Sequence, residues 1–194
     1  MIKVGITGGI GSGKSVVATL FRLYGIPVYM ADEESKKLLD TSACIKNKLR
    51  HLLGDDIYTE QGLDRKRLAS LIFNDAALLE EVNGIIHPEV RSHFADWTLR
   101  QGGAICSIES AILFESGFDE LVDKVLTVYA PLELRLARVQ KRDNSPVETI
   151  MHRVNSQLSD EIKKERSDFV VYNDDRHALI PQVERLVGLL NNPG

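Results

Sequence analysis

The sequence has little cysteine and no long apolar run. Its two cysteines, Cys44 and Cys106, are too few for a disulfide framework and have no cluster of metal-ligating residues around them. No apolar stretch approaches the ~18 residues that a membrane span needs. The first apolar run ends in glycines by Gly8, so it is not typical of a signal peptide. We therefore expect a cytoplasmic protein in a reducing compartment, with no membrane association.

An excess of positive charge is also missing. The chain has 24 Lys and Arg residues against 28 Asp and Glu, which gives a formal net charge of −4. This balance argues against a strongly basic nucleic-acid binder, but it allows a local basic pocket for an anionic substrate. A length of 194 residues suits one domain with an insertion, which we expect to be a monomer or a weak homo-oligomer.

Short apolar runs alternate with helical patterns, and the sequence has no internal repeat. Strand character is found at residues 2–7, 26–30, 104–108, 124–130 and 169–172. Helical apolar spacing is found at residues 16–24 and 178–190, and residues 33–101 are helical, polar and rich in charge. The alternation predicts a three-layer α/β domain with a parallel sheet and a helical insertion. We expect a core of residues 1–32, 102–130 and 166–194, an insertion at 33–101 and a helical lid at 131–165.

Residues 8–15 read Gly-Gly-Ile-Gly-Ser-Gly-Lys-Ser and satisfy the P-loop pattern G-x-x-x-x-G-K-[ST] in full. A predicted strand precedes them and a predicted helix follows, as a P-loop requires. The glycines let successive backbone N–H groups point into one concavity, which binds phosphate oxygens at a helix N-terminus. Lys14 adds a cation towards the β and γ phosphates, and the Ser15 hydroxyl is a ligand for Mg²⁺. The motif predicts a nucleoside triphosphate site.

The class of P-loop protein is narrowed by two missing motifs. A GTPase would need N-K-x-D, but Asn47-Lys48 is followed by Leu49-Arg50. A motor or transporter ATPase would normally carry an apolar run ending in Asp-Glu, which the chain lacks. A small kinase that closes over its substrates is favoured. The alternatives are a P-loop switch that binds ATP without turnover, and a kinase of another small acceptor such as a nucleoside monophosphate.

Three arginines follow the strand at 124–130 with helical spacing. Arg135, Arg138 and Arg142 stand at i, i+3 and i+7, which predicts three guanidinium groups on one helical face. A mobile helix of this kind can bring positive charge to a transferring phosphoryl group. The alternative is a solvated basic face, paired with Glu133.

Further candidate residues each have two interpretations. Asp32 directly follows the second strand, so it either accepts the proton of an attacking hydroxyl or caps the helix that follows. Glu109 and Glu115 flank the end of the third strand, where they hold Mg²⁺ through water or are simply solvated. His87, which precedes Pro88, is either a binding-site histidine or part of a helix terminus.

Several short motifs occur in a characteristic order along the chain. They are T-G-G-I-G-S-G-K-S at 7–15, A-D at 31–32, L-D-R at 63–65 with Phe73, I-H-P at 86–88, A-I-L-F-E at 111–115, R-x-x-x-R-D at 138–143, Gln157 with Glu161 and Lys163, and S-D-F-V-V-Y-N at 167–173. Together they resemble the dephospho-coenzyme A kinase family over residues 2–189. Departures from the family pattern are Met30, Ala111, Ser167 and Phe169. Met30 replaces a carboxylate, so Asp32 would act as base unaided.

The resemblance implies a P-loop kinase fold and transfer of the γ-phosphoryl group of ATP to the ribose 3′-hydroxyl of dephospho-coenzyme A. It implies a catalytic set of Asp32 as general base with Lys14 and Arg142, and it implies Mg²⁺ at Ser15. The ATP contacts that it implies are Gly9, Gly11, Ser12, Gly13, Lys14, Ser15, Val16, Arg138, Arg142 and Asn173, the last near the adenine. The acceptor contacts that it implies are Thr7, Asp32, Arg65 and His87.

Overall fold

The computed structural model describes residues 1–73 and 75–191, which form two compact units. The first unit is Met1–Met30 together with Arg100–Gly194, and the second is Ala31–Leu99. The second unit thus begins and ends two residues before the insertion expected at 33–101.

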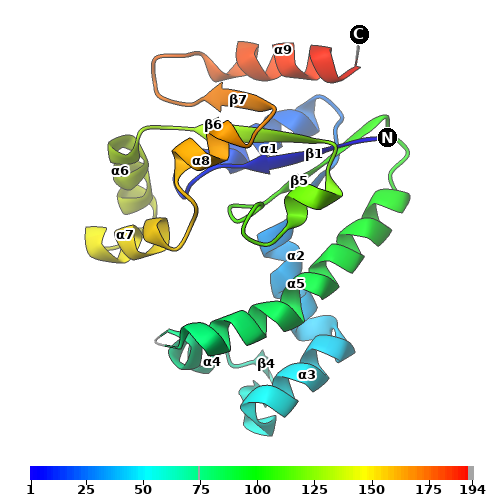
Figure 1. Cartoon of the computed structure of the whole chain (residues 1–194), viewed down its shortest axis with the longest axis vertical. Helices are drawn as coiled ribbons and strands as arrows, with labels where there is room; N and C mark the ends of the chain where they lie inside the picture. The colour runs from blue at the N-terminus through cyan, green and yellow to red at the C-terminus, as the bar shows by residue number, and fades with distance from the viewer. Residues whose placement is uncertain (74, 192–194) are drawn as a thin grey trace. The chain divides into compact units, whose positions relative to one another are not determined.

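The first unit contains a five-stranded sheet in the order β2-β5-β1-β6-β7, with every neighbouring pair parallel (Figure 1). Its strands are β1 (Ile2–Thr7), β2 (Val28–Met30), β5 (Ile105–Glu109), β6 (Lys124–Tyr129) and β7 (Phe169–Tyr172). Each lies within two residues of the range expected from the sequence. The strands read as continuous apolar runs because both faces of a parallel sheet are covered.

One face of the sheet packs against α1 (Lys14–Leu23) and α9 (Leu179–Asn191). Val4 and Ile6 of β1 face this core, where Phe21 of α1 is fully buried. Val183 and Val187 of α9 complete the same cluster. The 3.6-residue spacing of apolar side chains on each helix buries one stripe and leaves the opposite one in water.

The other face of the sheet is covered by the segment after β5 and by α8 (Asp160–Glu165). Gly5 alternates with Val4 and Ile6, and a Cβ atom on it would lie 2.7 Å from the Leu113 side chain. The segment continues into a 3₁₀ turn, η2 (Phe118–Leu121), in which Phe118 is buried. A side chain at residue 5 would therefore force the buried Leu113 side chain to move.

Two helices precede α8 in the range expected for the lid. They are α6 (Leu132–Asp143) and α7 (Val147–Asn155), joined through Asn144 in the left-handed conformation. Val139 of α6 and Ile150 of α7 form a small apolar cluster with Ile10 of the P-loop. The range 131–165 thus belongs to the first unit and packs directly on the P-loop.

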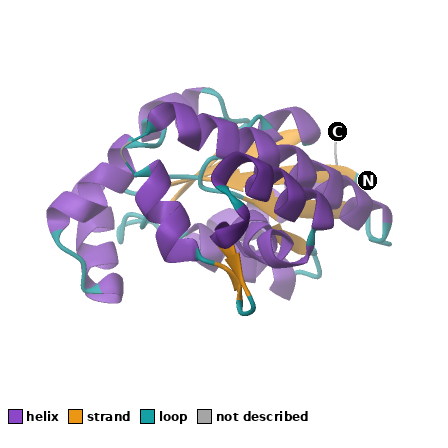
Figure 2. Ribbon diagram, turned by 90° about the horizontal axis from the view of Figure 1, so that it is seen from below, coloured by secondary structure: helices purple, strands orange, loops and turns teal. Residues whose placement is uncertain are grey.

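The second unit is mostly helical, as expected, and Figure 2 shows helices in purple and strands in orange. Its helices are α2 (Ala31–Thr41), α3 (Ala43–Leu53), α4 (Arg65–Ile72) and α5 (Ala76–Leu99), and α5 contacts the other three. The expectation of helix throughout was incomplete, because a 3₁₀ turn, η1 (Asp55–Ile57), leads into a hairpin of β3 (Tyr58–Thr59) and β4 (Gly62–Leu63). The buried Tyr58 hydroxyl donates to the Leu39 carbonyl at 2.8 Å and ties this hairpin to α2.

Among residues 1–73 and 75–191, no helix is both long enough and apolar enough to cross a membrane.

Candidate active site

The P-loop connects β1 to α1, so it lies at the carboxyl edge of the sheet, where α/β proteins bind ligands. Gly13 caps α1 with φ 97°, and its carbonyl accepts from the N–H groups of Val16 and Val17 at 3.0 and 3.2 Å. Lys14 is buried, and its Nζ donates to the Gly9 carbonyl at 3.3 Å. The N-terminus of a ten-residue helix and a lysine therefore meet in one loop, as an anion site requires.

Two positions of the loop require glycine for two reasons: the backbone has a positive φ, and a neighbouring group leaves no room for a Cβ atom. Gly11 has φ 81°, and a Cβ atom on it would lie 2.6 Å from the backbone carbonyl oxygen of Arg135. A Cβ atom on Gly13 would collide with the side-chain amide of Asn173. That amide donates to the Ser12 carbonyl at 2.8 Å, and the Asn173 N–H donates to Tyr129 at 2.8 Å. Asn173 thus fastens the end of β7 to the P-loop, and its position near the adenine stays a prediction.

The hydroxyl groups of the site differ in accessibility. Ser15 is exposed at the start of α1, where its Oγ is open to a ligand, and Val16 beside it is 51% exposed. The hydroxyls of Thr7 and Ser12 are buried and have no hydrogen-bond partner. The acceptor contact implied for Thr7 stays a prediction, since its hydroxyl is covered in this conformation.

The three arginines of α6 differ in exposure, so the alternative of a fully solvated basic face is wrong for Arg135. Arg138 donates to the Asn173 carbonyl at 2.9 Å and to Asp175 at 2.7 Å. Arg142 is 61% exposed and forms a bidentate pair with Asp143, at 2.6 and 2.9 Å. Arg135 lies one helical turn before Arg138 and two turns before Arg142. Its side chain packs against the P-loop and is only 5% exposed. The pairs of Arg138 and Arg142 are partly exposed and therefore weak enough to be exchanged for phosphate.

The two acids that flank β5 have different surroundings. Glu109 ends β5 in register with Ile6 of β1, and its side chain is buried. Glu115 accepts from the Leu158 N–H at 2.7 Å and lies 3.2 Å from Nζ of the fully buried Lys163. Burial lowers the pKa of Lys163, and Glu115 opposes that shift. Glu115 therefore binds protein donors, so its interpretation as a merely solvated carboxylate is wrong.

The remaining candidates belong to the second unit. Asp32 lies inside the first turn of α2, which begins at Ala31, so its interpretation as an N-cap is wrong. The strand and the helix adjoin directly and leave no capping position at residue 32. Asp32 is exposed to solvent at the N-terminal end of this helix.

Arg65 and His87 are the acceptor-side candidates. Arg65 begins α4 and donates to Asp40 at 2.6 Å and to the Lys36 carbonyl at 3.1 Å. This hydrogen bond from Arg65 lowers the pKa of Asp40. His87 lies in the middle of α5, so its interpretation as a helix terminus is wrong. Burial and the nearby Arg91 charge lower the pKa of His87, so the imidazole is neutral at pH 7.

The family model of dephospho-CoA kinase matches residues 2–178. The chain belongs to the dephospho-CoA kinase family. The dephospho-CoA kinase of Bacteroides fragilis is 48% identical over 190 residues, which cover 97% of this chain and 93% of that protein.

Solved structures agree with the assignment to the dephospho-CoA kinase family. The dephospho-CoA kinase from Campylobacter jejuni matches with a TM-score of 0.70 and 26% identity, covering 97% of this chain and 96% of that one. A crystal structure of a Thermus thermophilus protein matches with a TM-score of 0.82 and 33% identity, covering 98% and 96%. The predicted P-loop kinase fold is confirmed, and the chain is an enzyme of the final step of coenzyme A synthesis.

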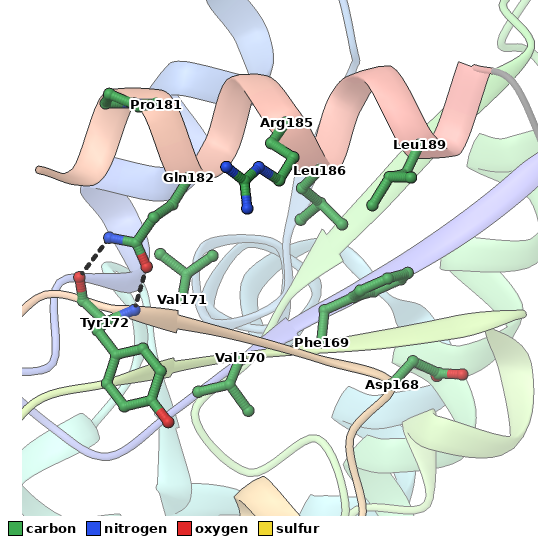
Figure 3. Close-up of a pocket in the computed structure, with 10 residues that line it drawn as sticks. All are labelled: Asp168, Phe169, Val170, Val171, Tyr172, Pro181, Gln182, Arg185, Leu186 and Leu189. Atoms are coloured by element: carbon green, nitrogen blue, oxygen red, sulfur yellow. Dashed lines mark hydrogen bonds between the residues drawn. The ribbon is translucent and has the colours of Figure 1, made fainter. Parts of the chain in front are cut away.

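A hollow of about 430 Å³ lies between β7 and α9 (Figure 3). In the sheet order, β7 is two strands away from β1, which leads into the P-loop. Gln182 reaches from α9 to the β7 edge, where it accepts from the Tyr172 N–H and donates to the Tyr172 carbonyl, both at 2.9 Å (Figure 3). Val170, Leu186 and Leu189 are among the other residues that line the hollow. The hollow is a junction of strand and helix, separate from the phosphate site.

Replacing Gly11 with alanine tests the packing of the P-loop, with Gly25→Ala as a matched control. Both glycines have positive φ, 81° and 76°, but a Cβ atom at Gly25 would meet nothing within 4 Å. Both variants should lose about 1–2 kcal/mol of stability from backbone strain. Gly11→Ala should also weaken ATP binding by about tenfold or more, because α6 must shift. Melting temperature and calorimetric ATP Kd measure the two effects, and equal ATP Kd values would contradict this account of the loop.

Proposed function

We propose that the P-loop, Asp32 and the exposed arginines of α6 carry out the reaction of the dephospho-CoA kinase family in this chain. The γ-phosphoryl group of ATP passes to the ribose 3′-hydroxyl of dephospho-CoA, which gives coenzyme A and ADP. The observation that carries the proposal is a complete P-loop, with a buried lysine at the N-terminus of α1, in a chain that matches the family model over residues 2–178.

The phosphate side of the proposal rests on charge and backbone geometry. Loop N–H groups, the positive end of α1 and Lys14 supply fixed positive potential for the β and γ phosphates. Arg138 and Arg142 exchange their partly exposed carboxylate partners for ATP as the lid closes. Asn173 contacts the nucleotide next to the P-loop carbonyl that it already holds.

The acceptor side of the proposal lies in the second unit. Asp32 follows the carboxyl end of β2 by two residues and presents an exposed carboxylate. It accepts or orients the proton of the 3′-hydroxyl as that oxygen attacks. Arg65 supplies a cation and His87 a neutral imidazole for binding the acceptor.

Mg²⁺ fits the residues present. This ion prefers oxygen ligands, keeps several waters and is usually held by one or two protein groups plus substrate phosphates. The exposed Ser15 hydroxyl is such a group, and Glu109 at the adjoining strand end is the acid that would hold a metal-bound water. No group of three or more His, Cys, Asp or Glu side chains in the described residues offers an all-protein site. Bound with ATP, Mg²⁺ neutralises charge on the β and γ phosphates.

The proposed partners are ATP and dephospho-CoA, with no nucleic acid or membrane, and the proposed location is the cytoplasm, where ATP is available. An assay of ADP release against a panel of acceptors tests the reaction. Release should depend on dephospho-CoA and be far slower with nucleoside monophosphates. Preference for a nucleoside monophosphate would overturn the proposed identity of the acceptor. If none of the acceptors in the panel gave ADP release, the chain would instead be an ATP-binding switch.

Asp32→Asn tests the proposed base, with Glu33→Gln as a control in the same helical turn. Asparagine keeps the shape of the side chain but loses its charge, so kcat should fall by about 10²–10⁴. The lower end is expected, because proton movement is late in a loose phosphoryl-transfer transition state. ATP Kd and melting temperature should stay near the wild-type values, as should kcat of Glu33→Gln. A normal kcat in a folded Asp32→Asn variant would refute the assignment.

Glu109→Gln and Glu115→Gln together test the proposed metal ligand. Glu109→Gln should raise the Mg²⁺ concentration needed for half-maximal rate, because a neutral amide holds metal-bound water less strongly. Glu115→Gln should instead lower the melting temperature, because it leaves the buried Lys163 without its carboxylate. Titration of Mg²⁺ against initial rate separates the two. A changed Mg²⁺ requirement in Glu115→Gln alone would reverse the assignment.

A further inference from the structure

Two consecutive residues of the P-loop, Gly9 and Ile10, are held by side chains from the lid range. Asp160 accepts from the Gly9 N–H at 2.9 Å, and Gln157 accepts from the Ile10 N–H at 3.2 Å. Arg135 donates from Nη1 to the Ile10 carbonyl at 3.3 Å. Three of the four backbone polar groups of these residues are therefore bonded to residues more than a hundred positions away in the chain.

Arg135 and Asp160 also bind one another. Nη2 of Arg135 lies 2.6 Å from Oδ2 of Asp160, and the two side chains are only 5% and 11% exposed. Nε of Arg135 is buried and has no hydrogen-bond partner. A buried ion pair gains little stability over apolar residues of similar size, because both charges lose their hydration. An unsatisfied donor adds a further cost. Net stability therefore does not account for this arrangement.

The P-loop sequence is matched to the pair. A Cβ atom on Gly9 would collide with the Arg135 guanidinium and would lie 2.8 Å from Oδ1 of Asp160. At Gly11 the corresponding neighbour is the Arg135 backbone. Two glycines of the motif thus give room to Arg135, in addition to any role in binding phosphate.

We propose that Arg135, Asp160 and Gln157 are positioning residues for ATP. They hold the Gly9–Ile10 peptide so that the rest of the P-loop keeps the shape that receives phosphate, and the protein does not have to order the loop when ATP binds. None of the three needs to touch the nucleotide. The inference rests on the proposed use of the P-loop for ATP.

The test compares variants that separate stability from nucleotide affinity. Asp160→Asn leaves the Arg135 charge buried without a partner, so the melting temperature should fall. The double variant Arg135→Met with Asp160→Leu removes both charges, so most of the melting temperature should return. ATP Kd of the double variant, measured calorimetrically with Mg²⁺ and without acceptor, should remain about tenfold weaker than that of the wild type. KM for dephospho-CoA should change less than twofold.

A milder variant and a matched control complete the experiment. Gln157→Met keeps the length of the side chain but removes the acceptor for the Ile10 N–H, so ATP Kd should weaken about threefold with little change in melting temperature. Asp168→Asn is the control, because Asp168 also accepts a backbone N–H, from Val125, and pairs with Lys124, each at 2.8 Å, but without contact to the P-loop. It should leave ATP Kd unchanged.

Two results would overturn the proposal. One is a double variant that regains both the melting temperature and the ATP Kd of the wild type. If the double variant does not fold, an unchanged ATP Kd in Gln157→Met takes its place. The other is an equal loss of ATP affinity in Asp168→Asn. Failure of the wild-type chain to bind ATP would instead refute the proposed use of the P-loop, so the two failures are distinguishable.

Discussion

The nucleotide site depends on how closely other parts of the first unit approach the backbone of the P-loop. Asn173 contacts it from the end of β7, and Arg135 contacts it from the first turns of α6. Side chains on Gly11 or Gly13 would displace these neighbours. Because the loop is enclosed in this way, its shape is set by tertiary packing as well as by the conformational freedom of glycine.

Features that depend on local spacing could be predicted from the sequence. Apolar runs indicated the five strands of the sheet to within two residues, and the P-loop motif indicated the strand–loop–helix junction. Features that depend on distant contacts could not be predicted. Helical spacing placed Arg135 with Arg138 and Arg142, but its burial depends on Asp160, which is 25 residues later in the sequence, on the second helix after α6.

Short elements were missed for a related reason. The strands of the β3–β4 hairpin have two residues each, too few for an alternating pattern to be recognised. The interpretation of Asp32 as a cap assumed a residue between strand and helix, whereas α2 begins directly after β2. Glu115 could not be distinguished from a solvated acid, because its partner Lys163 is an apparently ordinary lysine of a polar helix until the fold buries it.

The contact of Gln182 with β7 has a consequence for self-association. As the last strand of the sheet, β7 has an outer edge whose backbone could pair with any extended chain. At Tyr172 the side-chain amide of Gln182 makes the two hydrogen bonds that a neighbouring strand would make. The sheet therefore terminates in a side chain rather than in open backbone at this residue. Two copies of the molecule could not join there, edge to edge, into one continuous sheet without first displacing that amide.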